Sequence, residues 1–105
     1  MAKVYITEYM RSAKELYNDV TIAAPQEGDN IGVVDQAPLT SGGASTQSAA
    51  FATATKLVRI HTDGIISVKF GVNPTADVNS KRMAANTTEY FGVRPGDKVA
   101  VITNT

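Results

Sequence analysis

Residues 56–61, Lys-Leu-Val-Arg-Ile-His, and residues 65–72, Ile-Ile-Ser-Val-Lys-Phe-Gly-Val, decide the fold class of this chain. Both runs are rich in β-branched residues, and Thr62-Asp63-Gly64 separates them. An Asp-Gly pair between two such runs predicts a β-hairpin. Alternation gives that hairpin one apolar face and one mixed face. The apolar face holds Val58, Ile60, Ile66, Val68 and Phe70, and the mixed face holds Arg59, His61 and Lys69.

A second chain reversal follows towards the end of the sequence. Residues 88–93 lead through Arg94-Pro95-Gly96-Asp97 into residues 98–103. Proline fixes φ at the first corner and glycine tolerates positive φ at the next, so this stretch predicts a turn. Residues 99–102 are apolar on both faces, which predicts a central or covered strand. Because a small domain has limited capacity to cover both sides, we expect a homo-oligomer, with a trimer favoured.

The first half of the chain gives weaker signals. Residues 3–9 alternate like a strand, residues 12–18 fit either one or two helical turns or a structured loop, and the small residues of 49–55 would suit a strand anchored by Phe51. Residues 36–48 contain Pro38 and Ser41-Gly42-Gly43 and are too polar to build a core. We therefore predict one all-β domain over residues 1–105, a compact antiparallel β-sandwich or jelly-roll-like domain, with a flexible polar loop or arm at about 36–48.

Composition narrows the classes of function. Ten basic and ten acidic residues cancel, which argues against a protein that wraps nucleic acid. The chain has no cysteine, so thiol catalysis, disulfides and cysteine metal sites are excluded. No apolar run reaches the length of a membrane span, and the first residues do not look like a signal peptide. We expect synthesis in a cytosol and no membrane partner.

Candidate catalytic groups are few. His61 is the only histidine, and no serine lies in a nucleophile-elbow pattern. The acidic residues of the second half lie in or near turns, where aspartate commonly bonds the local backbone. Gly42-Gly43 has no following lysine and no helix signal, so it does not predict a phosphate site. We predict that the protein is not an enzyme and uses no cofactor and no metal.

Four segments carry a resemblance to a known class of protein: residues 45–51, residues 57–63, residues 68–71 and residues 88–102. They resemble small virion proteins of tailed bacteriophages, over roughly residues 45–103. The resemblance implies a structural component of the virion, made in the bacterial host cytoplasm. Its partners would be the major capsid protein or other virion subunits.

Within that class we favour a capsid decoration or cement protein, which binds and stabilises the head shell. A neutral β body with a polar arm suits many repeated contacts on such a shell. A head-tail connector or a tail structural protein is the alternative. A non-enzymatic carbohydrate- or peptide-binding module is a further one, with Tyr90, Phe91 and Arg94 lining its site. The residues that we predict to contact a partner are Ser41, Gly42, Gly43, Arg59, His61, Lys69, Tyr90 and Arg94.

Overall fold

The computed structural model describes residues 1–10, 12–14, 21–25, 27 and 33–105. These residues form strands and no helix, so the prediction of an all-β fold is confirmed. The strands are β1 (Lys3–Tyr9), β2 (Ser12–Lys14), β3 (Thr21–Pro25), β4 (Val34–Asp35), β5 (Leu39–Thr40), β6 (Thr46–Gln47), β7 (Leu57–Thr62), β8 (Ile66–Gly71), β9 (Lys81–Met83), β10 (Thr87–Gly92) and β11 (Lys98–Thr103).

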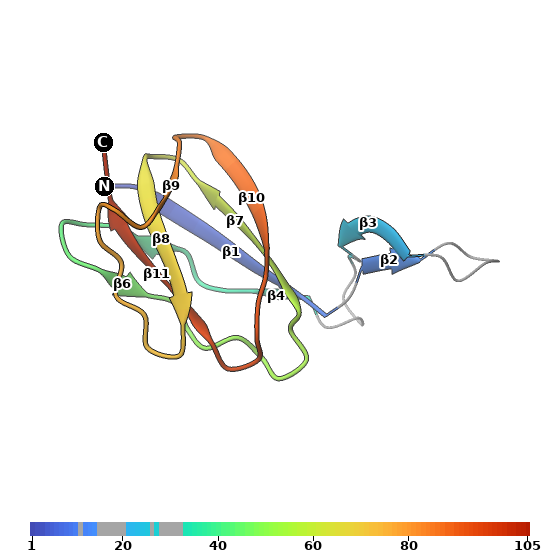
Figure 1. Ribbon diagram of the computed structural model, residues 1–105. Coiled ribbons are helices and arrows are strands. Elements are labelled where there is room, and N and C mark those ends of the chain that lie inside the picture. Colours follow the sequence, from blue (N-terminus) through green and yellow to red (C-terminus); the bar gives the residue numbers. More distant parts are fainter. Residues whose placement is uncertain (11, 15–20, 26, 28–32) are drawn as a thin grey trace.

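Two antiparallel sheets pack face to face (Figure 1). The five-stranded sheet has the order β10-β7-β1-β4, with β5 also paired to β1, and the four-stranded sheet has the order β6-β11-β8-β9. This arrangement is an antiparallel β-sandwich, as predicted. The strands β2 and β3 pair with each other and form a hairpin that stands away from the sandwich (Figure 1).

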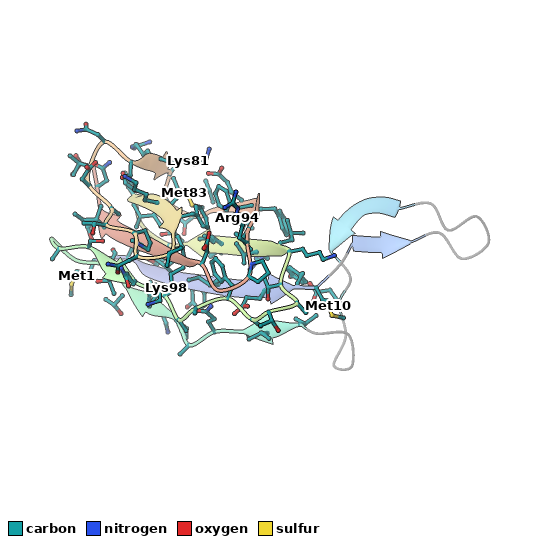
Figure 2. All side chains as sticks on the ribbon, turned by 60° about the horizontal axis from the view of Figure 1, so that its bottom comes forward. Met1, Met10, Lys81, Met83, Arg94 and Lys98 are labelled. Carbon is teal, nitrogen blue, oxygen red and sulfur yellow. The ribbon has the colours of Figure 1, made fainter. Side chains whose placement is uncertain are left out.

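The core fills the space between the two sheets (Figure 2). Alternation along β1 and β7 turns every second side chain inwards, so Val4, Ile6, Val58 and Ile60 are buried. The four-stranded sheet adds apolar side chains from β8, β9 and β11. Three phenylalanines line one end of the core, with ring centroids 6.5 Å apart for Phe51 and Phe70 and 4.9 Å apart for Phe70 and Phe91. The buried cluster comprises Ala2, Val4, Ile6, Phe51, Val58, Ile60, Ile66, Val68, Met83, Val99 and Val101.

The predicted hairpin across Asp63-Gly64 is wrong. β7 pairs with β1 and β10, whereas β8 pairs with β11 and β9, so the chain crosses from one sheet to the other at this point. Asp63 stays bonded to β1, because its N–H donates to Lys3 O over 3.2 Å and its Oδ1 accepts from Lys3 N over 2.7 Å. Gly64 is required by close approach, since an added Cβ would lie 2.9 Å from the Cβ of Ala2. It does not have the positive φ of a mirror-image turn.

The turn between β10 and β11 is confirmed. Gly96 has a φ of 80°, and the N–H of Asp97 donates to Arg94 O over 3.2 Å. Proline at the second position and a positive-φ glycine at the third are typical of a type II turn. This turn also carries the chain between the sheets, because β10 and β11 belong to different ones.

The strand β11 lies between β6 and β8, so the prediction of a central strand is confirmed. Val99, Ala100 and Val101 are all fully buried. The connection formed by residues 72–80 helps to cover the outer side, since it is bonded to β6 through Gln47, which donates to Pro74 O over 2.8 Å. The chain therefore covers this strand by itself, and β11 gives no reason to expect an oligomer. The homo-oligomer, and a trimer in particular, stays a prediction.

The connection from residue 49 to residue 56 differs from the expected strand. Its residues form no strand, although Phe51 is buried as the anchor of the segment. Glu8, a buried acid on β1, organises this connection: its Oε1 accepts from Ala52 N over 2.8 Å and from Thr55 Oγ1 over 2.7 Å. Residues 12–18 were predicted to form either one or two helical turns or a structured loop. Residues 12–14 form the strand β2 instead, and residues 15–18 lie outside the described residues.

Candidate functional site

The outer face of the five-stranded sheet gathers cationic and aromatic side chains. Alternation brings every second residue of β1, β7 and β10 to this side. The strand register places Tyr5 beside His61, which pairs with Thr88, and Thr7 beside Arg59, which pairs with Tyr90. We call this set the outer face: Lys3, Tyr5, Thr7, Arg59, His61, Thr88 and Tyr90.

Contacts within the outer face hold several of its side chains in place. The rings of Tyr5 and His61 have centroids 6.1 Å apart, and His61 Nδ1 and Thr88 Oγ1 share a hydrogen bond of 2.8 Å. Lys3 Nζ lies 5.4 Å from the centroid of the Tyr5 ring. Tyr5 and Tyr90 are 38% and 51% exposed, so two aromatic side chains remain available at the surface. Tyrosine and arginine are enriched where proteins bind other proteins.

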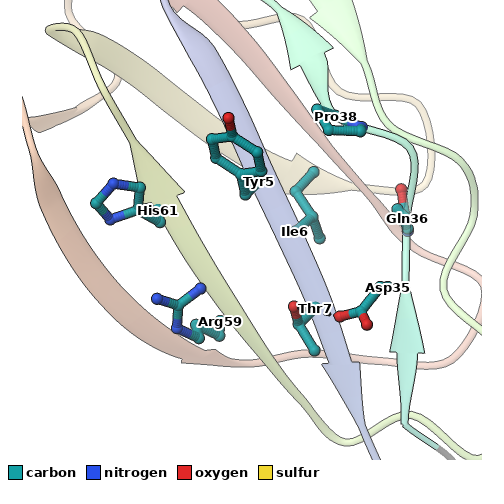
Figure 3. Close-up of a pocket in the computed structure, with 8 residues that line it drawn as sticks. All are labelled: Tyr5, Ile6, Thr7, Asp35, Gln36, Pro38, Arg59 and His61. Carbon is teal, nitrogen blue, oxygen red and sulfur yellow. Dashed lines mark hydrogen bonds between the residues drawn. The ribbon is translucent and has the colours of Figure 1, made fainter.

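A shallow open depression of about 530 Å³ lies over β1, between β7 and residues 35–38 (Figure 3). Tyr5, Arg59 and His61 form one side of it, and Asp35, Gln36 and Pro38 form the other. Thr7 Oγ1 donates to Asp35 Oδ1 over 2.8 Å at its floor. The depression offers a ring, a cation and a carboxylate within one concave surface, which suits a polar ligand or a protruding side chain of a partner.

The structure brings together three of the eight predicted contact residues. Arg59, His61 and Tyr90 share the outer face, whereas Lys69 lies on the outer side of the four-stranded sheet and lines a separate depression of about 470 Å³. Arg94 lies in the β10–β11 turn beside a third depression, of about 380 Å³. Lys69 was expected beside Arg59 because both belonged to the predicted hairpin. Once β8 joins the other sheet, the two side chains point to opposite sides of the sandwich.

The Ser41-Gly42-Gly43 stretch lies at the end of the sandwich where the two chain ends meet (Figure 1). Ser41 is fully buried: its Oγ accepts from Ala2 N over 2.9 Å and shares a hydrogen bond of 2.7 Å with Thr103 Oγ1. Gly42 O accepts from Thr103 N over 2.9 Å. These bonds fasten β1 to β11, so the side chain of Ser41 is not available for a partner. Gly43 is exposed.

The segment 36–48, predicted to be a flexible loop or arm, contains the short strands β5 and β6. Gln36 Nε2 donates to Glu8 Oε2 over 2.8 Å, and Ser48 Oγ accepts from Val99 N over 3.0 Å. The segment is thus bonded to the body of the sandwich at several points. Its mobility in solution stays a prediction.

The polar groups inside the fold have structural partners. Within the described part of the chain, every buried side-chain nitrogen or oxygen has a hydrogen-bond partner. Tyr9 is buried at the end of β1, and its hydroxyl donates to Glu27 Oε2 over 2.6 Å. Burial, and then the Glu27 carboxylate, raise the pKa of Tyr9 above its ordinary value. Among the same described residues, no group of three or more His, Cys, Asp or Glu side chains could hold a metal ion.

Four residues of the outer face were not among the predicted contact residues: Lys3, Tyr5 and Thr7 of β1, and Thr88 of β10. The signal for the three on β1 was present, because residues 3–9 were predicted to be a strand and alternation places their side chains opposite the apolar Val4 and Ile6. The neighbourhood of Tyr5 with His61 could not be predicted, since it depends on the pairing of β1 with β7.

Comparisons with known families, with curated proteins and with solved structures found no match to this chain. In the part of the chain that the structure describes, no helix is long and apolar enough to cross a membrane.

Proposed function

We propose that the protein is a structural component of a tailed-bacteriophage virion, a capsid decoration or cement protein that binds the head shell through the outer face. The resemblance of residues 45–103 to small virion proteins supports the class. The observation that carries the contact surface is the gathering of Tyr5, Arg59, His61 and Tyr90 on one exposed sheet face. Exposed tyrosine and arginine side chains on one sheet face suit a repeated contact with the subunits of a shell.

The head-tail connector and tail roles use the same kind of surface and differ in where the protein lies on the particle. Immunogold labelling of particles produced by the organism that carries the gene distinguishes them. Label distributed over the head supports the cement role, and label confined to the neck or tail supports the alternatives. Absence of the protein from purified particles contradicts all three.

The contact surface is tested with two single variants and a matched third. Arg59→Ala and Tyr5→Ala truncate side chains of the outer face, whereas Lys69→Ala truncates an exposed side chain of the other sheet. We expect each of the first two to reduce occupancy on particles at least about tenfold, as truncation of a central tyrosine or arginine does. Lys69→Ala should leave it unchanged. Loss of occupancy with Lys69→Ala alone would move the contact to the four-stranded sheet.

A ligand-binding module is the second candidate function, and the depression beside Tyr5 favours it. The site first expected for that function is not formed, because the Phe91 ring packs against Phe70 in the core while Tyr90 points outwards. The depression instead joins the Tyr5 ring to Arg59, Asp35 and Gln36, which suits a sugar or a short peptide. If the protein binds to a glycan or peptide array and Tyr5→Ala abolishes that binding, the ligand-binding function is supported. If the protein binds to neither array, this function is ruled out.

A further inference from the structure

The edges of the sandwich are unequal. Exposed edge strands are sites of unwanted pairing, and proteins protect them with short strands, proline, charge or a covering loop. The edge opposite β10 in the five-stranded sheet is made by β4 and β5, two residues each with Pro38 between them. In the four-stranded sheet, β6 has two residues and is bonded to residues 73–74, and β9 has three residues that include Lys81 and Arg82.

The edge strand β10 is less protected: it is not short, it has no proline, and its one charged side chain, Glu89, lies 4.0 Å from Lys81 Nζ. It runs for six residues, Thr-Thr-Glu-Tyr-Phe-Gly, without proline, lysine or arginine, and pairs with β7 in one unbroken register. Among the described strands it pairs with β7 alone. It is the longest edge strand of the sandwich within the described residues.

The direction of its free backbone groups follows from two hydrogen bonds. Asp63 N donates to Lys3 O and Val93 N donates to Lys56 O. Because backbone groups of an antiparallel strand point alternately to either side, the odd residues of β10 bond to β7 and the even residues face outwards. The N–H and C=O groups of Thr88, Tyr90 and Gly92 therefore point away from the sheet, and all three residues are exposed.

We propose that this edge pairs with the same edge of a second copy of the chain, in an antiparallel β10–β10 dimer whose two-fold axis passes beside Tyr90. In this register Tyr90 faces the partner's Tyr90, and Thr88 faces the partner's Gly92 in both directions. Each such pair exchanges two main-chain hydrogen bonds, which gives up to about six across the interface. The two five-stranded sheets become one continuous sheet.

Charge selects the register. Lys81 Nζ lies 4.0 Å from Glu89 and 5.7 Å from the centroid of the Phe91 ring. In the register centred on Tyr90, Glu89 faces the partner's Phe91. Because Lys81 lies beside Phe91 in each copy, Glu89 also approaches the partner's Lys81. The Lys81–Glu89 ion pairs of the two copies then form one cluster of alternating charges. A register centred on Glu89 would place two carboxylates directly opposite each other, which is destabilising.

The third register, centred on Phe91, is excluded by length. It would pair Tyr90 with the partner's Gly92, but Thr88 would then face the Arg94-Pro95 turn beyond the end of β10. It makes fewer main-chain bonds than the register centred on Tyr90. In the register centred on Tyr90 the edge of β10 is complementary to itself and keeps like charges apart. We therefore assign a second copy of the chain as the partner that pairs with this edge.

Single cysteines test the dimer directly, because the natural chain contains none. Cα atoms of a hydrogen-bonded antiparallel pair lie about 5.5 Å apart, within the range of a disulfide. We expect Tyr90→Cys to form a disulfide-linked dimer on mild oxidation, much faster than Val72→Cys, an exposed control on the β8–β9 connection. Glu89→Cys should not cross-link, since its two copies would be separated by two residues along the strand. Equal rates for Tyr90→Cys and Val72→Cys, or faster linking of Glu89→Cys, overturn the proposal.

The unmodified chain gives the second measurement. Sedimentation velocity should show a concentration-dependent monomer–dimer equilibrium, and Tyr90→Lys should weaken it at least about tenfold, because two like charges would then face each other. Val72→Lys, with the same change of charge, should leave it unchanged. If the chain stays monomeric at every concentration, the proposal is overturned. A strand from a different protein would then be the remaining partner for the β10 edge.

Discussion

Replacement of Glu8 by alanine should destabilise the fold more than any other single change of a polar side chain in β1. Glu8 is 2% exposed, and its carboxylate accepts three hydrogen bonds, from Ala52 N at 2.8 Å, Thr55 Oγ1 at 2.7 Å and Gln36 Nε2 at 2.8 Å. These bonds join β1 to the segment after β4 and to the connection before β7. The side chain therefore fastens two irregular segments to the sheet.

The magnitude follows from the three donors. Thr55 is buried and loses its partner, whereas Gln36 keeps a second acceptor in Ala49 O at 3.3 Å and the Ala52 N–H can reach water. A buried donor without a partner costs about 1–3 kcal/mol, and bonds to a charged group are worth about 1.5–3 kcal/mol each. The relief of a desolvated carboxylate offsets part of this loss. We expect Glu8→Ala to lower the free energy of unfolding by about 3–5 kcal/mol.

Urea unfolding followed by circular dichroism measures this effect, with equal slopes required for the variants compared. Glu8→Gln keeps one acceptor oxygen and should cost less, about 1–2 kcal/mol. Thr7→Ala, the adjacent change on the outer face, is the control and should stay within about 0.5 kcal/mol of the natural chain. If Glu8→Ala also stays within about 1 kcal/mol, the buried network does not organise these segments and the reasoning is refuted.

Three further changes test separate parts of the fold. Gly64→Val should lower the free energy of unfolding by more than about 1 kcal/mol, because its Cβ would lie 2.9 Å from the Cβ of Ala2; an unchanged urea midpoint would contradict that packing. Deletion of residues 41–44 removes the hydrogen bonds that join the start of β1 to β11, so it should lower the melting temperature. If these residues were a free arm, the deletion would leave the melting curve like that of the natural chain. The raised pKa of Tyr9 favours its neutral form in the folded state, so its contribution to stability is complete below about pH 10 and is lost as the pH rises through the folded-state value. Tyr9→Phe should remove this alkaline loss, and identical alkaline unfolding curves for the two chains would show that Tyr9 does not cause it.

The strands of the second half could be predicted because their signal is local. Alternation in residues 57–62 and the continuous apolar run in residues 99–102 depend only on neighbours in the sequence. The burial follows both patterns, since every second residue of β7 is buried while Val99, Ala100 and Val101 of β11 are all buried. The Pro95-Gly96 turn was predicted for the same reason. At Asp63-Gly64 a local signal predicts the wrong strand pairing, because a pair of turn residues indicates that the chain bends but not which strands then pair.

Sheet membership is a non-local property. β7 pairs with β1 although residues 10–56 separate the two strands in the sequence, and Gly64 is needed for the approach of Ala2, which no pattern near Gly64 reveals. Because β7 and β8 belong to different sheets, Lys69 lies far from Arg59, and the predicted contact surface is divided between two faces of the sandwich. The role of Ser41 could not be predicted for a similar reason, since its polar surroundings indicate a loop while its partners are Ala2, just before β1, and Thr103 in β11.

An electron-microscopy map of the particle decides whether this sandwich is mounted on a virion through the outer face of its five-stranded sheet, as we propose. We expect density for the sandwich on the head shell, with Tyr5 and Arg59 turned towards the capsid subunits and Lys69 turned away. Particles that lack the protein, or a sandwich seated on the shell through its four-stranded sheet, would contradict it.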